Sequence, residues 1–133
     1  MKRLAILVIA LAVIILSVYT FVLNAGQGGK EHVVIIPSGA FIPPEGWKKG
    51  ERVYDDRYFS PNTLEINVGD YVRWINRDSV THTVTSEKTP VGGSGFDSVL
   101  SPGKSFRTRF TKAGEYDYYC TIHPWQGGRV IVS

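Results

Sequence analysis

Beyond residue 30, the feature that most constrains the fold is a series of short alternating or β-branched stretches. Such stretches are typical of β-strands, and none of them shows the period of an amphipathic helix. Turn signals such as Gly69-Asp70 and Pro102-Gly103 separate them. Strands are predicted over residues 33–36, 63–68, 71–76, 82–86, 104–110, 114–120 and 128–132. About seven short strands at this spacing predict an all-β fold, a β-sandwich of Greek-key type.

The N-terminal segment is the exception to this pattern. Leu4 to Leu23 carry no charge, and this length is close to the roughly 20 apolar residues that cross a bilayer as a helix. Ala25 offers a small residue for signal-peptide cleavage, but the bulky Leu23 fits such a site poorly. We therefore predict one uncleaved transmembrane helix, with Lys2 and Arg3 inside and the rest of the chain on the extracytoplasmic side. Cleavage would instead give a secreted or periplasmic protein.

The sequence divides into an anchor, a tether and one domain. Residues 1–24 are the anchor or signal peptide, and residues 25–30 are a short, polar, glycine-rich tether. Residues 31–133 form the single domain. Within it, residues 38–59 do not fit a strand, and they form an insertion longer than most connections in compact domains. Its aromatic and proline residues either cover part of the domain or contact a partner.

The charge of the chain gives no indication of a nucleic-acid partner. The formal net charge of +3 falls to +1 once Lys2 and Arg3 are set aside. Arg107 and Arg109 alternate on one face of a predicted strand, a pattern typical of solvated surface. We expect no nucleic-acid partner, whereas membrane and protein partners stay open.

The only cysteine lies three residues before one of the three histidines. Cys120 ends a predicted strand and His123 lies in the loop that Pro124 turns, so both side chains can reach one point. His82 follows a strand and a polar turn and can return to the same end of a sheet. One thiolate and two imidazoles favour copper, whereas structural zinc normally takes four Cys and His ligands. His32 lies far from both ligand loops, and we assign it to the surface.

The sequences around these residues resemble the cupredoxins, the blue-copper family that includes plastocyanin and amicyanin. The resemblance covers about residues 60–133 and rests on the motifs VGDYVRW, NRDSVTHTV, SPGKSF, AGEYDYYC and CTIHPWQGG. By position it implies one copper ion per chain, held by His82, Cys120 and His123. The axial methionine of the family falls on Gln126.

Gln126 allows two arrangements at the axial position of the copper site. Its amide oxygen can approach copper as a harder ligand than a thioether, which favours Cu(II) and lowers the reduction potential. Alternatively the side chain turns away, and water or a small molecule takes the axial position. An open position distinguishes a catalytic metal site from a closed one.

Two functions follow from the resemblance. The first is a mononuclear type 1 copper protein that carries single electrons between redox partners on the outer face of the membrane, and so is not an enzyme. The alternative is an open-site copper protein that acts on a small molecule such as a nitrogen oxide. In the carrier, electrons leave through His123, Pro124 and Trp125, with Tyr119 as a second exit beside the thiolate.

Strand alternation orients the aromatic residues near the thiolate. Tyr116, Tyr118 and Cys120 share one face of their strand and are predicted to point inward, while Tyr119 points outward. Asn76 and Thr83 flank the first histidine loop. Either they hydrogen-bond the loop or the sulfur, or they are turn residues.

Overall fold

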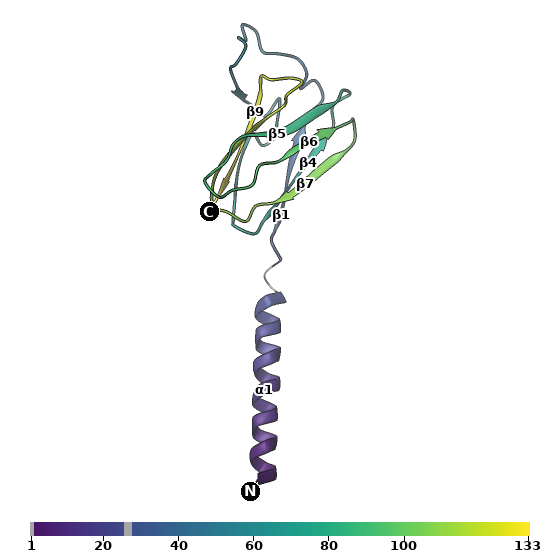
Figure 1. Ribbon diagram of the computed structural model, residues 1–133. Coiled ribbons are helices and arrows are strands. Elements are labelled where there is room, and N and C mark those ends of the chain that lie inside the picture. Colours follow the sequence, from purple (N-terminus) through teal and green to yellow (C-terminus); the bar gives the residue numbers. More distant parts are fainter. Residues whose placement is uncertain (1, 26–27) are drawn as a thin grey trace.

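The computed structural model describes residues 2–25 and 28–133. This part of the chain holds one helix and nine strands (Figure 1). The elements are α1 (Lys2–Ala25), β1 (Glu31–Ile36), β2 (Val53–Tyr54), β3 (Thr63–Ile66), β4 (Tyr71–Asn76), β5 (His82–Lys88), β6 (Asp97–Leu100), β7 (Ser105–Arg109), β8 (Gly114–Tyr119) and β9 (Gln126–Val132). The predicted tether, residues 25–30, lies partly outside the described residues.

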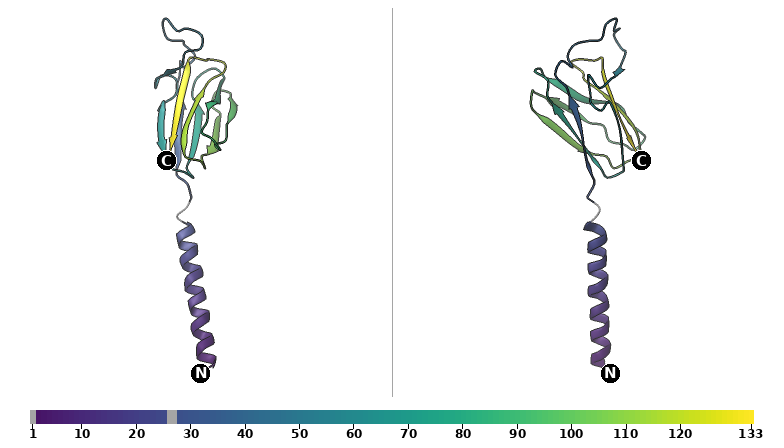
Figure 2. Two further views of the ribbon diagram at one scale, coloured as in Figure 1. Left: turned by 60° about the vertical axis from the view of Figure 1, so that its left-hand side comes forward. Right: turned by 180° about the vertical axis from the view of Figure 1, so that it is seen from behind.

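Two mixed sheets pack face to face as a β-sandwich (Figure 2). The smaller sheet has the order β1-β4-β7, with β1 parallel and β7 antiparallel to β4. The larger sheet has the order β2-β9-β8-β5-β6, and β3 also pairs with β9. Both β2 and β3 run parallel to β9, one after the other along the same edge. The predicted sandwich is confirmed.

The seven predicted strands are confirmed with small shifts at their ends, and two strands were missed. One is β2, which lies inside the insertion and has only two residues. The other is β6, a four-residue strand that follows a glycine-rich loop. Both are too short to show a periodic pattern in sequence. Their pairing with β9 and β5 stabilises them.

Aromatic side chains fill the space between the sheets. Trp74 is fully buried on β4, and its ring lies 5.3 Å from those of Phe96 and Tyr118 and 5.8 Å from that of Phe106. Edge and tilted contacts of this kind add to the stabilisation from burial, which is about 1.5–3 kcal/mol for one phenylalanine. This core fixes the positions of the strands that carry the metal-ligating loops.

The predicted faces of β8 are also confirmed. Tyr116 and Tyr118 are buried with 2% and 1% of their surface exposed, and Cys120 is fully buried. Tyr119 is only partly buried on the other face. The alternation of β8 therefore brings the thiol inward at the end of the strand.

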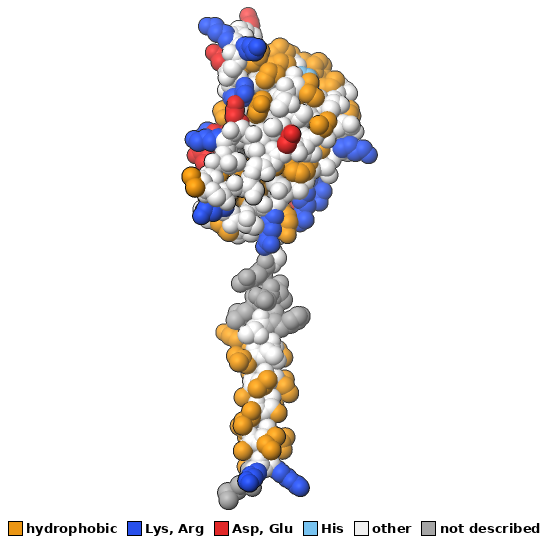
Figure 3. Space-filling model, in the orientation of Figure 1, with side chains coloured by type: hydrophobic (Ala, Val, Ile, Leu, Met, Phe, Trp, Pro, Cys, Tyr) orange, Lys and Arg blue, Asp and Glu red, His pale blue; other side chains and the backbone are white. Residues whose placement is uncertain are grey.

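Helix α1 is apolar enough to cross a membrane over Lys2–Thr20, with a mean hydropathy of 2.4. Its large hydrophobic side chains between Leu4 and Tyr19 are 55–70% exposed. They are seen in Figure 3 along the part of the helix that is not drawn in grey. The sandwich does not cover these side chains.

Candidate metal centre

Three ligand atoms from two loops meet at one end of the larger sheet. His82 begins β5, Cys120 follows β8 directly, and His123 lies in the loop from β8 to β9. Because β5 and β8 pair antiparallel, the start of β5 and the end of β8 lie at the same end of the sheet. The Cys120 Sγ atom lies 3.7 Å from the Nδ1 atoms of both His82 and His123, and these two nitrogens are 3.2 Å apart.

These separations fit a single metal ion. Metal–nitrogen and metal–sulfur bonds of about 2.0–2.3 Å place the ligand atoms of one ion about 3–4 Å apart. Among the described residues, the group that can hold a metal in this way is His82, Cys120 and His123. One thiolate with two imidazoles is the ligand set that favours copper over the hard cations.

Hydrogen bonds to the sulfur favour the thiolate form. The backbone N–H groups of Thr83 and His123 donate to Cys120 Sγ over 3.2 and 3.4 Å. Burial raises the pKa of the Cys120 thiol, but the hydrogen bonds from His82 and from these N–H groups outweigh burial and hold the pKa below its usual value. The thiolate needed for metal binding is therefore the form that this site stabilises.

Asp78 sets the tautomer of the first histidine. Its Oδ2 atom lies 2.8 Å from His82 Nε2, and both side chains are completely buried. Because a carboxylate can only accept, Nε2 carries the proton and the Nδ1 lone pair is free for a metal. Burial lowers the pKa of His82, but its hydrogen bonds to Cys120 and Asp78 raise the pKa above its usual value. The metal and a proton therefore compete for Nδ1.

Sequence reasoning missed this role of Asp78. The residue appears there only within the motif NRDSVTHTV, and its spacing of four residues before His82 was the available clue. Burial raises the pKa of Asp78, but N–H groups of Gly39 and Ser79 and the ring of His82 outweigh burial and keep the pKa low. Asp78 is thus an ionised group that also binds the backbone of the insertion.

We expect Asp78→Asn to weaken both the fold and the site. Each Asp78 oxygen accepts hydrogen bonds, and an NH₂ group in place of one oxygen would face a donor. Stability should fall by about 1–3 kcal/mol, and copper affinity by about 10–100-fold. Thermal unfolding of the apoprotein and a competitive copper titration measure the two effects.

Asp70→Asn is the matched control. Asp70 is also buried and also accepts from a histidine and from backbone N–H groups, but it lies outside the metal-ligating cluster. This variant should lose stability and keep its copper affinity. An equal loss of affinity in both variants would contradict the assigned role of Asp78.

Asn76 and Thr83 hydrogen-bond the metal-ligating loops. Of the two alternatives predicted for them, hydrogen bonding at the site or a role as turn residues, the structure shows the first. The Asn76 amide donates to the carbonyl oxygens of Val80 and Leu100, each over 2.8 Å, which ties the His82 loop to β6. The Thr83 hydroxyl accepts from the N–H of Thr121 over 2.8 Å. The contact from Thr83 to sulfur comes from its backbone and not from its side chain.

Gln126 points its amide into the ligand cluster. It is fully buried, and its Oε1 atom lies 3.0 Å from His82 Nδ1. Its Nε2 atom donates to the carbonyl oxygen of Ala40, which belongs to the insertion. The amide oxygen is therefore the atom that Gln126 presents beside the three ligands.

Aromatic residues surround the more exposed histidine. His123 is half-buried, and Trp125 lies 5.4 Å from its ring. Burial and the nearby His82 lower the pKa of His123. Trp47 of the insertion makes an edge contact with Trp125 at 5.5 Å. Figure 3 shows hydrophobic side chains gathered at the end of the domain away from α1.

His32 was expected at the surface, and it lies there partly covered. Its side chain is only 16% exposed, and its Nε2 atom lies 2.8 Å from Asp70 Oδ2. β1 and β4 run parallel and start side by side, so His32 near the start of β1 lies close to Asp70, which directly precedes β4. His32 is a structural residue outside the metal-ligating cluster.

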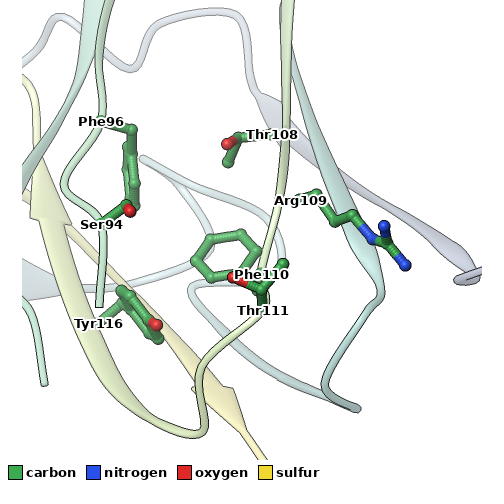
Figure 4. A pocket seen from close by; sticks show the side chains of 7 residues that line it. All are labelled: Ser94, Phe96, Thr108, Arg109, Phe110, Thr111 and Tyr116. Atoms are coloured by element: carbon green, nitrogen blue, oxygen red, sulfur yellow. The ribbon is translucent and has the colours of Figure 1, made fainter. Parts of the chain in front are cut away.

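A small cavity elsewhere in the sandwich is shown in Figure 4. It is lined by Ser94, Phe96, Thr108, Arg109, Phe110, Thr111 and Tyr116. Its volume of about 40 Å³ accommodates no more than a few water molecules. It is too small for a substrate and contains none of the three candidate ligands.

Comparison with known proteins gives the same answer as the geometry. Residues 7–132 match the model of the cupredoxin-like domain. The chain is 36% identical over 78 residues to amicyanin from Paracoccus denitrificans, a match that covers 58% of this chain and 59% of that protein. It is 35% identical over 104 residues to a plastocyanin from Synechococcus, which covers 70% of this chain and 73% of that protein.

A solved structure extends this likeness to three dimensions. The novel purple cupredoxin from Nitrosopumilus maritimus is 37% identical, with a TM-score of 0.60, and the match covers 76% of this chain and 98% of that one. The chain spans about three-fifths of the length of the amicyanin. It belongs to the cupredoxin family of copper electron-transfer proteins, with copper as its cofactor and a His-Cys-His group in place to bind it.

Proposed function

We propose that this protein is a membrane-tethered carrier of single electrons with a coordinatively closed copper site. His82, Cys120 and His123 are the proposed ligands, and the Gln126 oxygen takes the axial position. Copper supplies the Cu(I)/Cu(II) couple when bound. The observation that carries the proposal is the completely buried Gln126 amide, whose oxygen lies 3.0 Å from a ligand nitrogen. A buried amide oxygen at this position supports a closed site over an open one.

The surroundings of the ligands suit electron transfer because they resist movement. The Cys120 thiolate accepts hydrogen bonds from two backbone N–H groups, and Asp78 holds the His82 ring through a hydrogen bond to Nε2. The loop that carries His82 is tied to β6 by Asn76. Ligands held in this way change position little when an electron arrives or leaves, so the barrier to transfer is low.

The proposed electron port is the surface around His123, Pro124 and Trp125, with Tyr119 beside it. Arg52 of the insertion binds both parts of this surface. Its guanidinium donates to the Pro124 carbonyl over 2.8 Å and lies 4.2 Å from the centre of the Tyr119 ring. The port is therefore a braced surface on which a redox partner can dock.

The strand directions support a port that faces away from the membrane. β1 starts at Glu31, next to the proposed tether of residues 25–30, and runs to Ile36 at the other end of the sandwich. Ile36 is paired with Asn76, which adjoins the His82 loop. With residues 1–24 as the anchor and 31–133 as the exported domain, the port projects toward partners outside the membrane.

Titration with small ligands tests the proposal. The copper-loaded domain is followed by visible absorption and EPR while azide, nitrite or nitric oxide is added. A closed carrier keeps its spectra unchanged. Spectra that shift saturably would reveal an open axial position and would favour small-molecule redox chemistry instead.

We expect Gln126→Met to raise the reduction potential. A thioether is a softer ligand than an amide oxygen, so its preference for Cu(II) over Cu(I) is smaller. Each tenfold decrease in that preference raises a one-electron potential by about 59 mV. Protein-film voltammetry measures the shift, with Gln27→Met as a control in the proposed tether. An unchanged potential would mean that Gln126 does not interact with copper.

A further inference from the structure

We infer that the insertion, residues 38–59, fixes the orientation of the Gln126 amide and so keeps the axial position closed. The inference rests on the proposed carrier function and assigns the closure to a specific backbone group, the Ala40 carbonyl. Ala40 is fully buried and lies far from Gln126 in sequence.

The chemistry of the contact decides which end of the amide faces the ligands. A backbone carbonyl can only accept, so only the NH₂ group of Gln126 can face Ala40. The oxygen is then turned to the His82 side, where it lies 3.0 Å from Nδ1. The indole N–H of Trp125 donates to the same carbonyl over 3.3 Å. Both lone pairs of the Ala40 oxygen are thus used to orient residues of the second ligand loop.

The turn that presents Ala40 is held from both sides by one carboxylate. The N–H of Gly39 donates to Asp78 Oδ1 over 2.9 Å, and the N–H of Phe41 donates to Oδ2 over 3.3 Å. Gly39 has a φ of +84°, a conformation that glycine adopts freely and β-branched residues avoid. The carbonyl of Ala40 is therefore aimed by a backbone conformation that depends on Gly39.

The other end of the insertion fixes the backbone of Gln126. Val53 of β2 pairs with Gln126, and its N–H donates to the Trp125 carbonyl over 2.8 Å. One end of the insertion thus orients the side-chain amide, and the other positions the main chain that carries it. Together these contacts hold the buried Gln126 side chain in a single orientation.

Gly39→Val and Gly46→Val form a matched pair for the test. Both glycines lie in the insertion with positive φ, +84° and +73°, and an added Cβ has no close contact at either position. Only Gly39 adjoins Ala40. Azide titration should shift the Cu(II) EPR spectrum saturably in Gly39→Val, while Gly46→Val should keep its spectrum unchanged, as the wild type does.

NMR provides a second readout, which can be recorded on the wild-type apoprotein as well as on the copper form and the variants. In the apoprotein and in the diamagnetic Cu(I) form, the Gln126 side-chain amide should exchange slowly with water. It should also show a coupling through the hydrogen bond to the Ala40 carbonyl carbon. Both signals should be lost in Gly39→Val and kept in Gly46→Val.

The outcomes separate this inference from the proposed function. A wild type that ignores azide but has a freely exchanging, uncoupled Gln126 amide would overturn the inference and leave the carrier standing. A Gly39→Val variant identical to the wild type in both measurements would also overturn it. A wild type that binds azide while its amide stays coupled to Ala40 would overturn the closed carrier instead. If Gly39→Val does not fold, the wild-type coupling alone decides.

Discussion

Cys120→Ser should abolish the intense visible absorption of the Cu(II) protein. That absorption arises when a thiolate donates electron density to Cu(II), and a serine hydroxyl does not ionise at neutral pH. The site is built for sulfur, since the backbone N–H groups of Thr83 and His123 donate hydrogen bonds to Cys120 Sγ. Optical spectra of the copper-loaded variant measure the loss.

The serine variant should still fold, because serine is nearly the same size as cysteine and keeps the backbone of β8 unchanged. Circular dichroism checks this. His32→Asn is a suitable control, because it alters a histidine that pairs with Asp70 outside the metal-ligating cluster. It should keep the full colour. Visible absorption that persisted in Cys120→Ser would refute the assignment of the thiolate.

Gly128→Ala should cause a large loss of stability. A Cβ atom built at Gly128 would lie 2.2 Å from the Cζ atom of Tyr118, well inside contact distance. The Tyr118 ring cannot move aside, because it is buried with its centre 5.3 Å from that of Trp74 and 4.8 Å from that of Phe59. The expected cost is about 3 kcal/mol or more, a decrease in Tm of about 10 °C or more.

Gly127→Ala is the control on the same strand. Gly127 lies next to Gly128 on β9, and an added Cβ would meet Arg52 Cβ at 3.2 Å and the Tyr54 ring at 3.4 Å. Both side chains are on the surface side of the sheet and can shift slightly, so the loss should stay below about 1 kcal/mol. Thermal denaturation of the two apoproteins compares them. Equal decreases in Tm would show that Tyr118 adapts after all.

The sequence predicted those parts of the site that depend on residues close together in the chain. Cys120 and His123 are three residues apart, and strand alternation was enough to turn the thiol inward with Tyr116 and Tyr118. The short strands β2 and β6 carry too few residues for a period to be recognised, so pairing partners far along the chain determine them.

The parts that were missed depend on contacts between distant segments. Asp78 acts on Gly39 and Phe41 as well as on His82, and no sequence pattern links the first two to it. Ala40 acts through its carbonyl oxygen, which every residue possesses, so its side chain gives no clue. The pairing of His32 with Asp70 was missed for the same reason, since the register of β1 and β4 brings the two residues together.

The position of β9 has a consequence for how the protein acquires its metal. β9 is the last strand in the chain, yet it lies inside the larger sheet, with β8 on one side and β2 and β3 on the other. It also begins with Gln126. Until β9 has joined the sheet, the domain therefore lacks both an inner strand and the proposed axial residue. The proposed ligand set is therefore complete only in a domain whose larger sheet has formed.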